Sequence, residues 1–127
     1  MNQQQIAEYI LNKPEVIETT HYNSNAKIFK VRHKTFATLS NEDNGNCWLS
    51  VKTPPELALE LRQQHQQVVA GLQMNKKHWN SILLEQGFCT EQLRQLIDSS
   101  FRLVIEGMPL HQRDELLQRL KPVTSES

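Results

Sequence analysis

Residues 38–52, TLSNEDNGNCWLSVK, contain the feature that decides the fold class. Asn44-Gly45 is a strong hairpin signal, because both residue types tolerate the positive φ angles of a type I′ turn. The stretch that follows the turn alternates in character, with Cys47, Leu49 and Val51 on one face and Trp48, Ser50 and Lys52 on the other. Alternation of this kind is typical of a β-strand. The hairpin therefore predicts an antiparallel sheet.

Further strands are predicted on both sides of this hairpin. In AKIFKVRHK, residues 26–34, Phe29 and Val31 share one face, while Lys30 and Arg32 share the other. The next stretch, TFATL, continues as strand. Farther along, VVAGL at residues 68–72 is predicted to be a short extended piece, and HWNSILLE at 78–85 a strand rich in β-formers.

Two helices are predicted to begin at capping boxes. Asn2 and Gln5 have the spacing of a capping box for a helix over residues 3–12, and Lys13-Pro14 ends it. TPPE, residues 53–56, predicts a helix over 54–64, with Thr53 as its cap and Glu56 closing the box.

The longest predicted helix covers residues 90–106, with Thr90 as its cap and Gly107 as the C′ residue. Its apolar residues follow the i, i+3, i+4 rule. A short final helix follows Pro109. Helices and an antiparallel sheet in this order indicate the α+β class.

Length and charge limit the classes of function. The 127 residues suggest one domain, over residues 1–122, with a disordered tail at 123–127. The formal net charge is zero, so the whole molecule has no attraction to nucleic acid or to an anionic membrane. Cys47 and Cys89 stand singly, and no secretory leader or long apolar run is apparent. We expect a cytoplasmic monomer that does not associate with a membrane.

No catalytic or metal-binding pattern is present. The four glycines form no phosphate-binding loop, and the five histidines have no zinc-ligand spacing. Acidic residues form no obvious pair. We therefore predict no catalytic residues, no metal and no cofactor, and expect that the protein is not an enzyme.

Basic residues are concentrated locally. Residues 27–34 contain no acid and sum to +4, from Lys27, Lys30, Arg32 and Lys34. The simpler interpretation is a solvated strand face, or an edge strand protected by lysines. The alternative is a basic β-surface that contacts phosphates. In MNKKHWN, residues 74–80, Lys76 and Lys77 are expected in an exposed turn.

For each tryptophan the alternatives are burial in the core and exposure on a binding surface. Trp79 lies close to Ile82 and Leu83 in sequence, so we expect it to be mostly core. Trp48 shares its strand face with Ser50 and Lys52, which makes it the better candidate for partial exposure.

Several short motifs together resemble the MmcQ/YjbR family of small bacterial proteins. They occur in SVKTPPELALELRQQHQQV (50–68), MNKKHWNSILLE (74–85) and LRQLIDSSFRLV (93–104). The most characteristic pairs are Lys52-Thr53, Asn75-Lys76, His78-Trp79 and Ser100-Phe101. The resemblance covers nearly the whole chain.

This resemblance implies a CyaY-like α+β fold, an antiparallel sheet with helices packed on one side, similar to a double-wing DNA-binding domain. Family members often have glycines in the first hairpin turn, where this chain has Arg32-His33, so a turn longer than two residues is expected. The first helix carries only Glu8 as an acid, whereas iron-binding proteins of this fold carry an acidic ridge there. Iron binding is therefore not expected.

The resulting hypothesis is that the protein binds duplex DNA through a basic β-sheet surface, and that this binding is weak and non-specific. Phosphate contacts are predicted from Lys30, Arg32, Lys34, Lys52, Lys76 and Lys77. Trp48 or His78 would contact sugar or base. The alternative is a protein-interaction module with no nucleic-acid role, and an enzyme with an unrecognised site ranks last.

Overall fold

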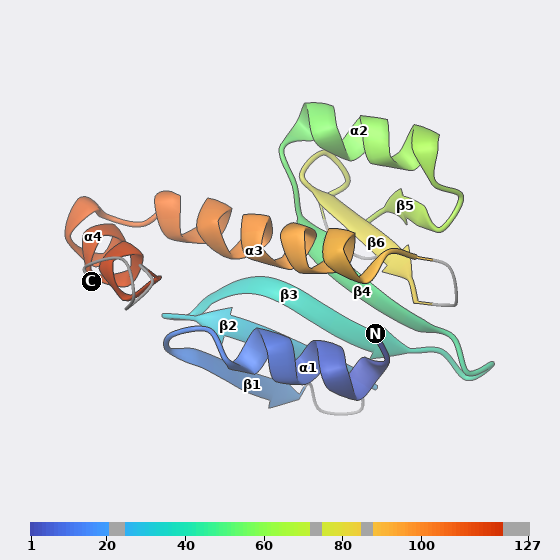
Figure 1. Ribbon diagram of the computed structural model, residues 1–127, viewed down its shortest axis with the longest axis horizontal. Helices are drawn as coiled ribbons and strands as arrows, with labels where there is room; N and C mark the ends of the chain where they lie inside the picture. Colours follow the sequence, from blue (N-terminus) through green and yellow to red (C-terminus); the bar gives the residue numbers. More distant parts are fainter. Residues whose placement is uncertain (21–24, 72–74, 85–87, 121–127) are drawn as a thin grey trace.

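The structure, a computed structural model, describes residues 1–20, 25–71, 75–84 and 88–120. Its sheet pairs in the order β1-β2-β3-β4-β6-β5, and every pairing is antiparallel (Figure 1). The strands are β1 (Val16–Thr20), β2 (Ala26–Val31), β3 (Lys34–Asn41), β4 (Cys47–Lys52), β5 (Val68–Ala70) and β6 (Trp79–Leu83). Together with the helices, this sheet confirms the predicted α+β class.

The helices of the described residues are α1 (Gln3–Leu11), α2 (Pro55–Gln64), α3 (Thr90–Glu106) and α4 (Leu110–Leu120). The bounds of α3 are those predicted, and α1 and α2 each differ by one residue at one end. In Figure 1, α3 lies between α1 and α2, across the middle of the sheet. The predicted tail, 123–127, lies outside the described residues.

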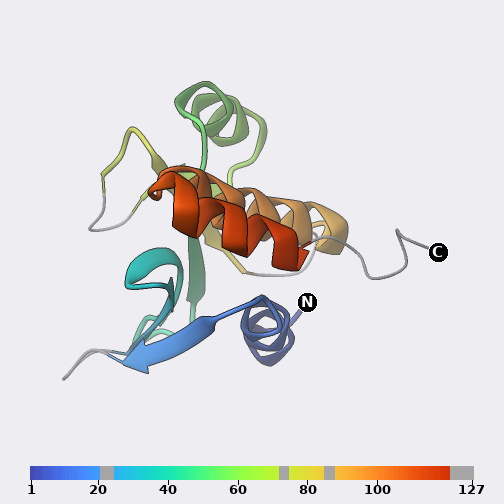
Figure 2. The same ribbon diagram turned by 90° about the vertical axis from the view of Figure 1, so that its left-hand side faces the viewer.

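The two faces of the sheet differ in what covers them. On one face, the paired residues Leu39, Leu49 and Ile82 are almost completely buried and belong to the core cluster that includes Ile6 of α1 and Ile97 of α3. The strands lie to one side of α1 and α3 in Figure 2. Strand alternation therefore places the other side chains on what we call the helix-free face. By register, these are Ile17, Thr19, Ala26, Ile28, Lys30, Thr35, Thr38, Ser40, Trp48, Ser50, Lys52, Val69, Trp79, Ser81 and Leu83.

A bulge in β3 explains a buried serine of α3. Phe29 pairs with Ala37 but Lys30 pairs with Thr35, so Phe36 is an extra residue in β3. Phe36 is completely buried, and its ring meets that of Phe101 edge to face at 5.0 Å between centroids. The Ser100 hydroxyl donates to Phe36 O at 2.5 Å and accepts from Lys52 N at 2.9 Å. Ser100 thus bridges β3 and β4 just beyond their last paired residues, Ala37 and Val51.

The two hairpin turns differ from the sequence expectations. Val31 pairs with Lys34, so the first turn has two residues, Arg32 and His33, and both have left-handed φ angles, 46° and 70°. This is type I′ geometry, and the expectation of a longer turn is wrong. The second connection, residues 42–46, is longer, and within it only Gly45 has a positive φ, 94°. The hairpin at Asn44-Gly45 is confirmed, but its type I′ turn is not.

The helix caps are only partly as predicted. The capping box of Asn2 and Gln5 is present. At α2 the cap residue is Pro54, which makes no side-chain cap hydrogen bond. Thr53 is buried, and its Oγ1 has no hydrogen-bond partner in the described part of the chain. Thr53 is not the cap because it continues the extended segment that follows β4. There its N–H donates to His78 O at 2.8 Å.

The predicted limits of α3 are right, but its cap residues are not. Cys89 is the cap residue, while Thr90 is the first helical residue, and Thr90 Oγ1 accepts from the Met1 ammonium at 3.3 Å. Gly107 ends the helix with φ of −83°, so its conformation does not require glycine.

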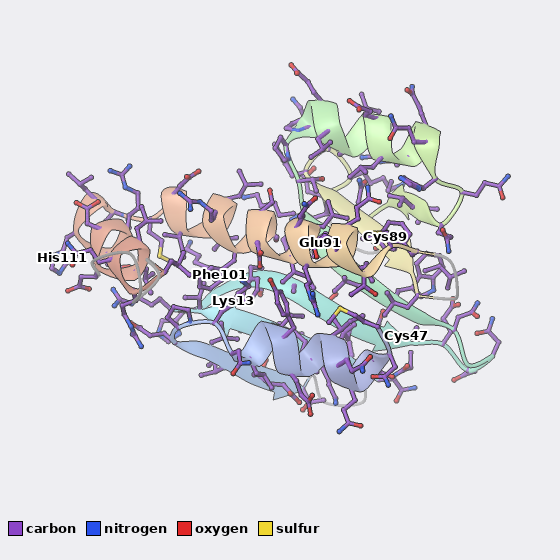
Figure 3. All side chains as sticks on the ribbon, in the orientation of Figure 1. Lys13, Cys47, Cys89, Glu91, Phe101 and His111 are labelled. Carbon is purple, nitrogen blue, oxygen red and sulfur yellow. The ribbon has the colours of Figure 1, made fainter. Side chains whose placement is uncertain are left out.

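A polar clamp joins α1 to α3. The Tyr9 hydroxyl lies 2.8 and 2.9 Å from the two carboxylate oxygens of Asp98, and Lys13 Nζ lies 2.5 Å from Asp98 Oδ1. Lys13 Nζ is also 5.4 Å from the centroid of the Phe101 ring (Figure 3). Burial, reinforced by Asp98, raises the pKa of Tyr9 to about 12.

Candidate functional site: the basic end of the sheet

Strand direction brings most of the predicted contact residues to one end of the sheet. Because neighbouring strands are antiparallel, β2 and β4 end where β3 and β6 begin. We call this the basic end, and it holds Lys30, Arg32, Lys34, Lys52, Lys76, Lys77 and His78. Trp48 is the second residue of β4 and therefore lies toward the opposite end.

Arg32 is committed to carboxylates, contrary to its predicted role as a free phosphate contact. Its guanidinium makes two hydrogen bonds of 2.8 Å to Glu15 and one of 2.9 Å to Glu115 of α4. Arg119 also binds Glu15, at 2.6 Å. The hydrogen bond from Arg32, the first of several causes, lowers the pKa of Glu15 to about 2. Releasing Arg32 to a phosphate would leave both carboxylates without this partner.

Lys34 and Lys52 have a structural role available to them. They line a pocket of about 170 Å³ with Leu103, Val104 and Gly107, at the C-terminal end of α3. A helix C-terminus carries partial negative charge, which favours nearby cations. The last turn of α3 has no basic residue of its own. Neither lysine has an ion pair among the described residues, so both charges remain available.

The turn before β6 holds its lysines outward. Asn75 Oδ1 accepts from Lys77 N at 2.9 Å, and Arg62 donates to Lys76 O at 2.6 Å. The turn is therefore held by backbone groups and by two other side chains. Lys76 and Lys77 themselves are exposed and have no ion pair in the described part of the chain. This arrangement agrees with the predicted polar turn.

Trp79 is the clearest correction to the sequence interpretation. It pairs with Lys52, so it lies on the helix-free face and not in the core, and it is only half-buried. Trp48 is also half-buried on this face, as expected, but its Nε1 is buried and has no hydrogen-bond partner among the described residues. Alternation along β6 was the missed signal, because Asn80 and Ile82 are the residues that face the helices.

Between the tryptophans lies a buried pair of serines. Ser50 Oγ and Ser81 Oγ are 2.7 Å apart, and these residues are 3% and 0% exposed. Since no helix of the described chain covers this face, larger side chains on the same face, including Trp48 and Trp79, are the groups available to shield them.

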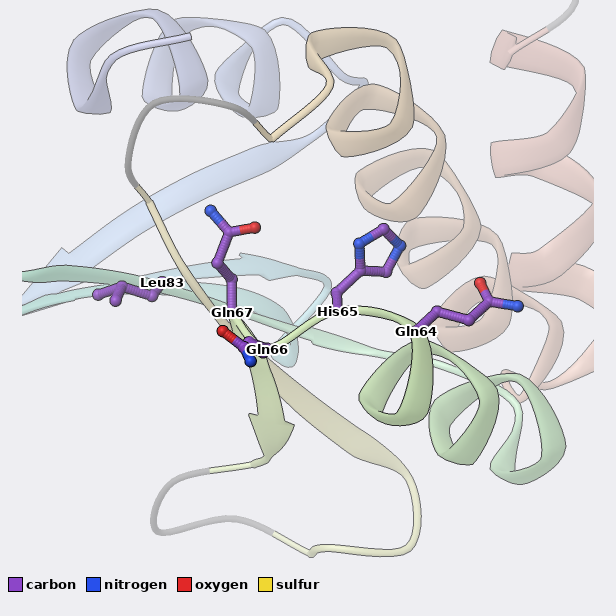
Figure 4. Close-up of a pocket in the computed structure, with 5 residues that line it drawn as sticks. All are labelled: Gln64, His65, Gln66, Gln67 and Leu83. Carbon is purple, nitrogen blue, oxygen red and sulfur yellow. The ribbon is translucent and has the colours of Figure 1, made fainter.

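A second hollow lies at the other end of β6. It has a volume of about 450 Å³ and is lined by Gln64, His65, Gln66, Gln67 and Leu83 (Figure 4). The described residues that line it carry amides and an imidazole, and none of them is a carboxylate or a lysine. His65 also contacts the ring of Phe88, at 5.2 Å between centroids.

The described residues provide no metal centre: no group of three or more His, Cys, Asp or Glu side chains is positioned to hold an ion. Of the two thiols, Cys89 is exposed and Cys47 is half-buried, and burial raises the pKa of Cys47. None of the helices in the described ranges is long and apolar enough to span a bilayer.

The four residue pairs that carry the family resemblance are joined at the basic end. Thr53 N donates to His78 O, Lys52 N donates to Ser100 Oγ, and Trp79 N donates to Asn75 O at 3.0 Å. These bonds link the end of β4, the turn before β6 and the middle of α3. Pairs distant in sequence therefore form one connected structure.

The sequence of this chain is similar to those of known proteins. The YjbR family model matches residues 11–103. YjbR of Escherichia coli K12 is 32% identical over 114 residues, covering 90% of this chain and 96% of YjbR. YbdF of E. coli O157:H7 is 35% identical over 95 residues, covering 75% of this chain and 74% of YbdF.

Two solved structures share the fold. Deinococcus radiodurans DR2400 superposes with a TM-score of 0.81 at 29% identity, covering 89% of this chain and 86% of DR2400. A Pseudomonas syringae protein gives 0.72 at 26% identity, with 82% and 99% covered. The family model spans most of the chain, and the relatives align over most of their own length. The chain is therefore a member of the YjbR family.

Proposed function

We propose that this protein binds duplex DNA weakly and without sequence preference, through the basic end and the adjoining helix-free face. The observation that carries the proposal is the convergence of lysines from separate segments. Lys30 comes from β2, Lys34 from the start of β3, Lys52 from the end of β4, and Lys76 and Lys77 from the turn before β6. None of these lysines has an ion pair among the described residues. Lysines without ion pairs at one end of the sheet are suited to contact phosphates.

Electrostatics sets the expected strength of binding. The formal net charge of zero gives no long-range attraction, so the local lysines must supply the affinity. Each phosphate contact contributes about −0.9 to the slope of log affinity against log salt concentration. With three to five lysines engaged, we expect a slope between about −3 and −4.5. Ordinary non-specific affinity extends to a Kd of about 100 µM.

Titration of a labelled duplex at several salt concentrations tests the proposal. The variant Lys76→Ala/Lys77→Ala should reduce the slope by about two, while the fold stays intact because the turn is held by Asn75 and Arg62. The matched control, Arg94→Ala/Arg102→Ala, removes the same charge from exposed positions on α3 and should leave the slope unchanged. Absence of binding at about 100 µM duplex would remove the proposal.

The second candidate is a protein-interaction module. It is favoured by the apolar groups on the helix-free face, where Ile17 is 53% exposed and Trp48 and Trp79 are half-buried. Exposed apolar side chains of this kind are typical of interaction surfaces when they are contiguous. If duplex and single-stranded DNA both fail to bind, this interpretation replaces the first.

A further inference from the structure

We propose that the helix-free face is a stacking platform for unpaired bases, so that single-stranded DNA binds it more tightly than duplex of the same length. The inference rests on the proposed function, since the lysines of the basic end supply the phosphate contacts in both cases. It adds the ligand class: a strand whose bases are free to leave their own stack.

Both tryptophans of the chain lie on this face. Trp48 pairs with Leu83 and Trp79 pairs with Lys52, on adjacent strands. Four residues along a strand and one strand spacing across separate their Cα atoms by about 14 Å. The face thus offers two separate stacking positions, and an aromatic face accepts any base. In a duplex both faces of most bases are already stacked, so neither tryptophan can be used in this way.

The strip of sheet between the tryptophans is buried, so the tryptophan rings themselves are the groups available for stacking. Ser50 Oγ and Ser81 Oγ lie 2.7 Å apart, and the two residues are 3% and 0% exposed, so a base does not reach them. Trp48 Nε1 is also buried and has no acceptor among the described residues. A buried N–H does not reach a base edge, so a bound base contacts only the exposed part of the Trp48 ring.

Charge on this face favours an anionic partner. By register, no described position of the helix-free face is acidic. Lys30 lies on the face by register, and Lys52 ends β4 at its edge, where it also lines the pocket beside α3. Lys76 and Lys77 lie in the turn that precedes Trp79. An aromatic surface bordered by cations is the general arrangement by which proteins bind single strands without sequence preference.

The hollow at the end of β6 borders this face at Leu83. Leu83, the partner of Trp48, also lines the hollow of about 450 Å³ with Gln64, Gln66 and Gln67. This volume falls within the range of about 300–1,000 Å³ typical of small-molecule sites. Glutamine amides both donate to and accept from base edges.

Intrinsic fluorescence and labelled-strand titration test the proposal with the full chain. Trp48 and Trp79 are the only tryptophans, so emission reports on this face alone. A 20-nucleotide single strand should quench the emission and bind at least about fivefold more tightly than the matching duplex. Trp48→Leu should weaken single-strand binding by about 5- to 150-fold, the equivalent of about 1–3 kcal/mol per stacked base, and change duplex binding little.

Trp79→Leu is the second variant, and thermal unfolding of both variants checks that they fold. Leu59→Ser, at an exposed position on α2, is the matched control and should change neither affinity. If duplex binds but the single strand is no tighter and does not quench, the platform is overturned and the proposed function stands. If the single strand is tighter but both tryptophan variants bind normally, the platform is again overturned. Failure of both ligands to bind overturns the two proposals together.

Discussion

Replacing Ser100 with alanine tests the bridge between β3, β4 and α3. Ser100 is completely buried, and its hydroxyl serves two backbone groups, Phe36 O at 2.5 Å and Lys52 N at 2.9 Å. Both groups lie beyond the last residue pair of β3 and β4, Ala37 with Val51. Alanine removes the hydroxyl and leaves both groups without this partner.

The expected loss follows from the burial of these two groups. A buried polar group left unsatisfied costs about 1–3 kcal/mol, so two cost about 2–6 kcal/mol. Lys52 is only partly buried, so water can reach its N–H, and this favours the lower part of the range. Alanine regains about 0.5 kcal/mol of helix propensity. We therefore expect Ser100→Ala to lower the free energy of unfolding by about 2–3 kcal/mol.

Equilibrium unfolding by urea and by heat measures this change, and Ser99→Ala is the matched control. Ser99 is the preceding residue of α3, is half-buried, and makes no side-chain hydrogen bond with any residue that the structure describes. Its replacement should be neutral or stabilising by about 0.5 kcal/mol. Ser100→Ala should lower Tm by roughly 6–15 °C relative to this control. If the two variants unfold within about 0.5 kcal/mol of each other, the hydroxyl does not perform the bridging inferred from its distances.

Three further outcomes are expected. The pKa of Glu15 is lowered from 4.5 to about 2, so its carboxylate stabilises the fold above pH 4.5 and loses this effect as pH falls toward 2. In urea unfolding at a series of pH values, Glu15→Gln should therefore reduce the fall in unfolding free energy between pH 4.5 and 2. Gly71→Ala should destabilise the fold by about 1–3 kcal/mol, because the added Cβ would lie 2.6 Å from Trp79 Cβ. At Gly107 the nearest atom to an added Cβ is 3.6 Å away, so Gly107→Ala should be tolerated in thermal melts. In a thiol-reagent titration near pH 8, Cys89 should react well before Cys47, whose half-burial raises its pKa; equal rates would contradict this order.

Local sequence patterns were sufficient for most of the secondary structure. The apolar spacing of residues 90–106 predicted α3 with its observed limits, and alternation in Cys47 to Lys52 predicted β4. β1 was missed, because Val16–Thr20 is an edge strand with no regular burial pattern. Its formation depends on pairing with β2, which local alternation does not report.

Caps and turns were less predictable, because several residues satisfy the same local rule. Thr53 has the residue type and spacing of a cap, yet its N–H is held by His78 O and Pro54 takes the cap position. Arg32 and His33 are not the Asn, Asp or Gly residues typical of a type I′ turn, but the β2–β3 register leaves these two residues for the turn. The bonds from Arg32 to Glu15 and Glu115 then hold it.

The candidate site was predicted in composition but not in arrangement. The lysines of the basic end were identified from charge alone, and strand direction brings them together. Arg32 could not be excluded from sequence, because its partners Glu15 and Glu115 are 17 and 83 residues away. Trp79 was placed in the core because its apolar neighbours outweighed the alternation along β6.

The sequence by itself determined the α+β class, the limits of the longest helix and the local concentration of basic residues at 27–34 and 76–77, because each depends on residues close to one another in the chain. Only the tertiary structure decided which cations stay free and which face each tryptophan occupies. Those outcomes depend on strand register and on contacts between distant segments, such as Ser100 with Phe36 and Lys52. A shift of one residue in register moves every side chain to the opposite face, so local composition alone does not specify them.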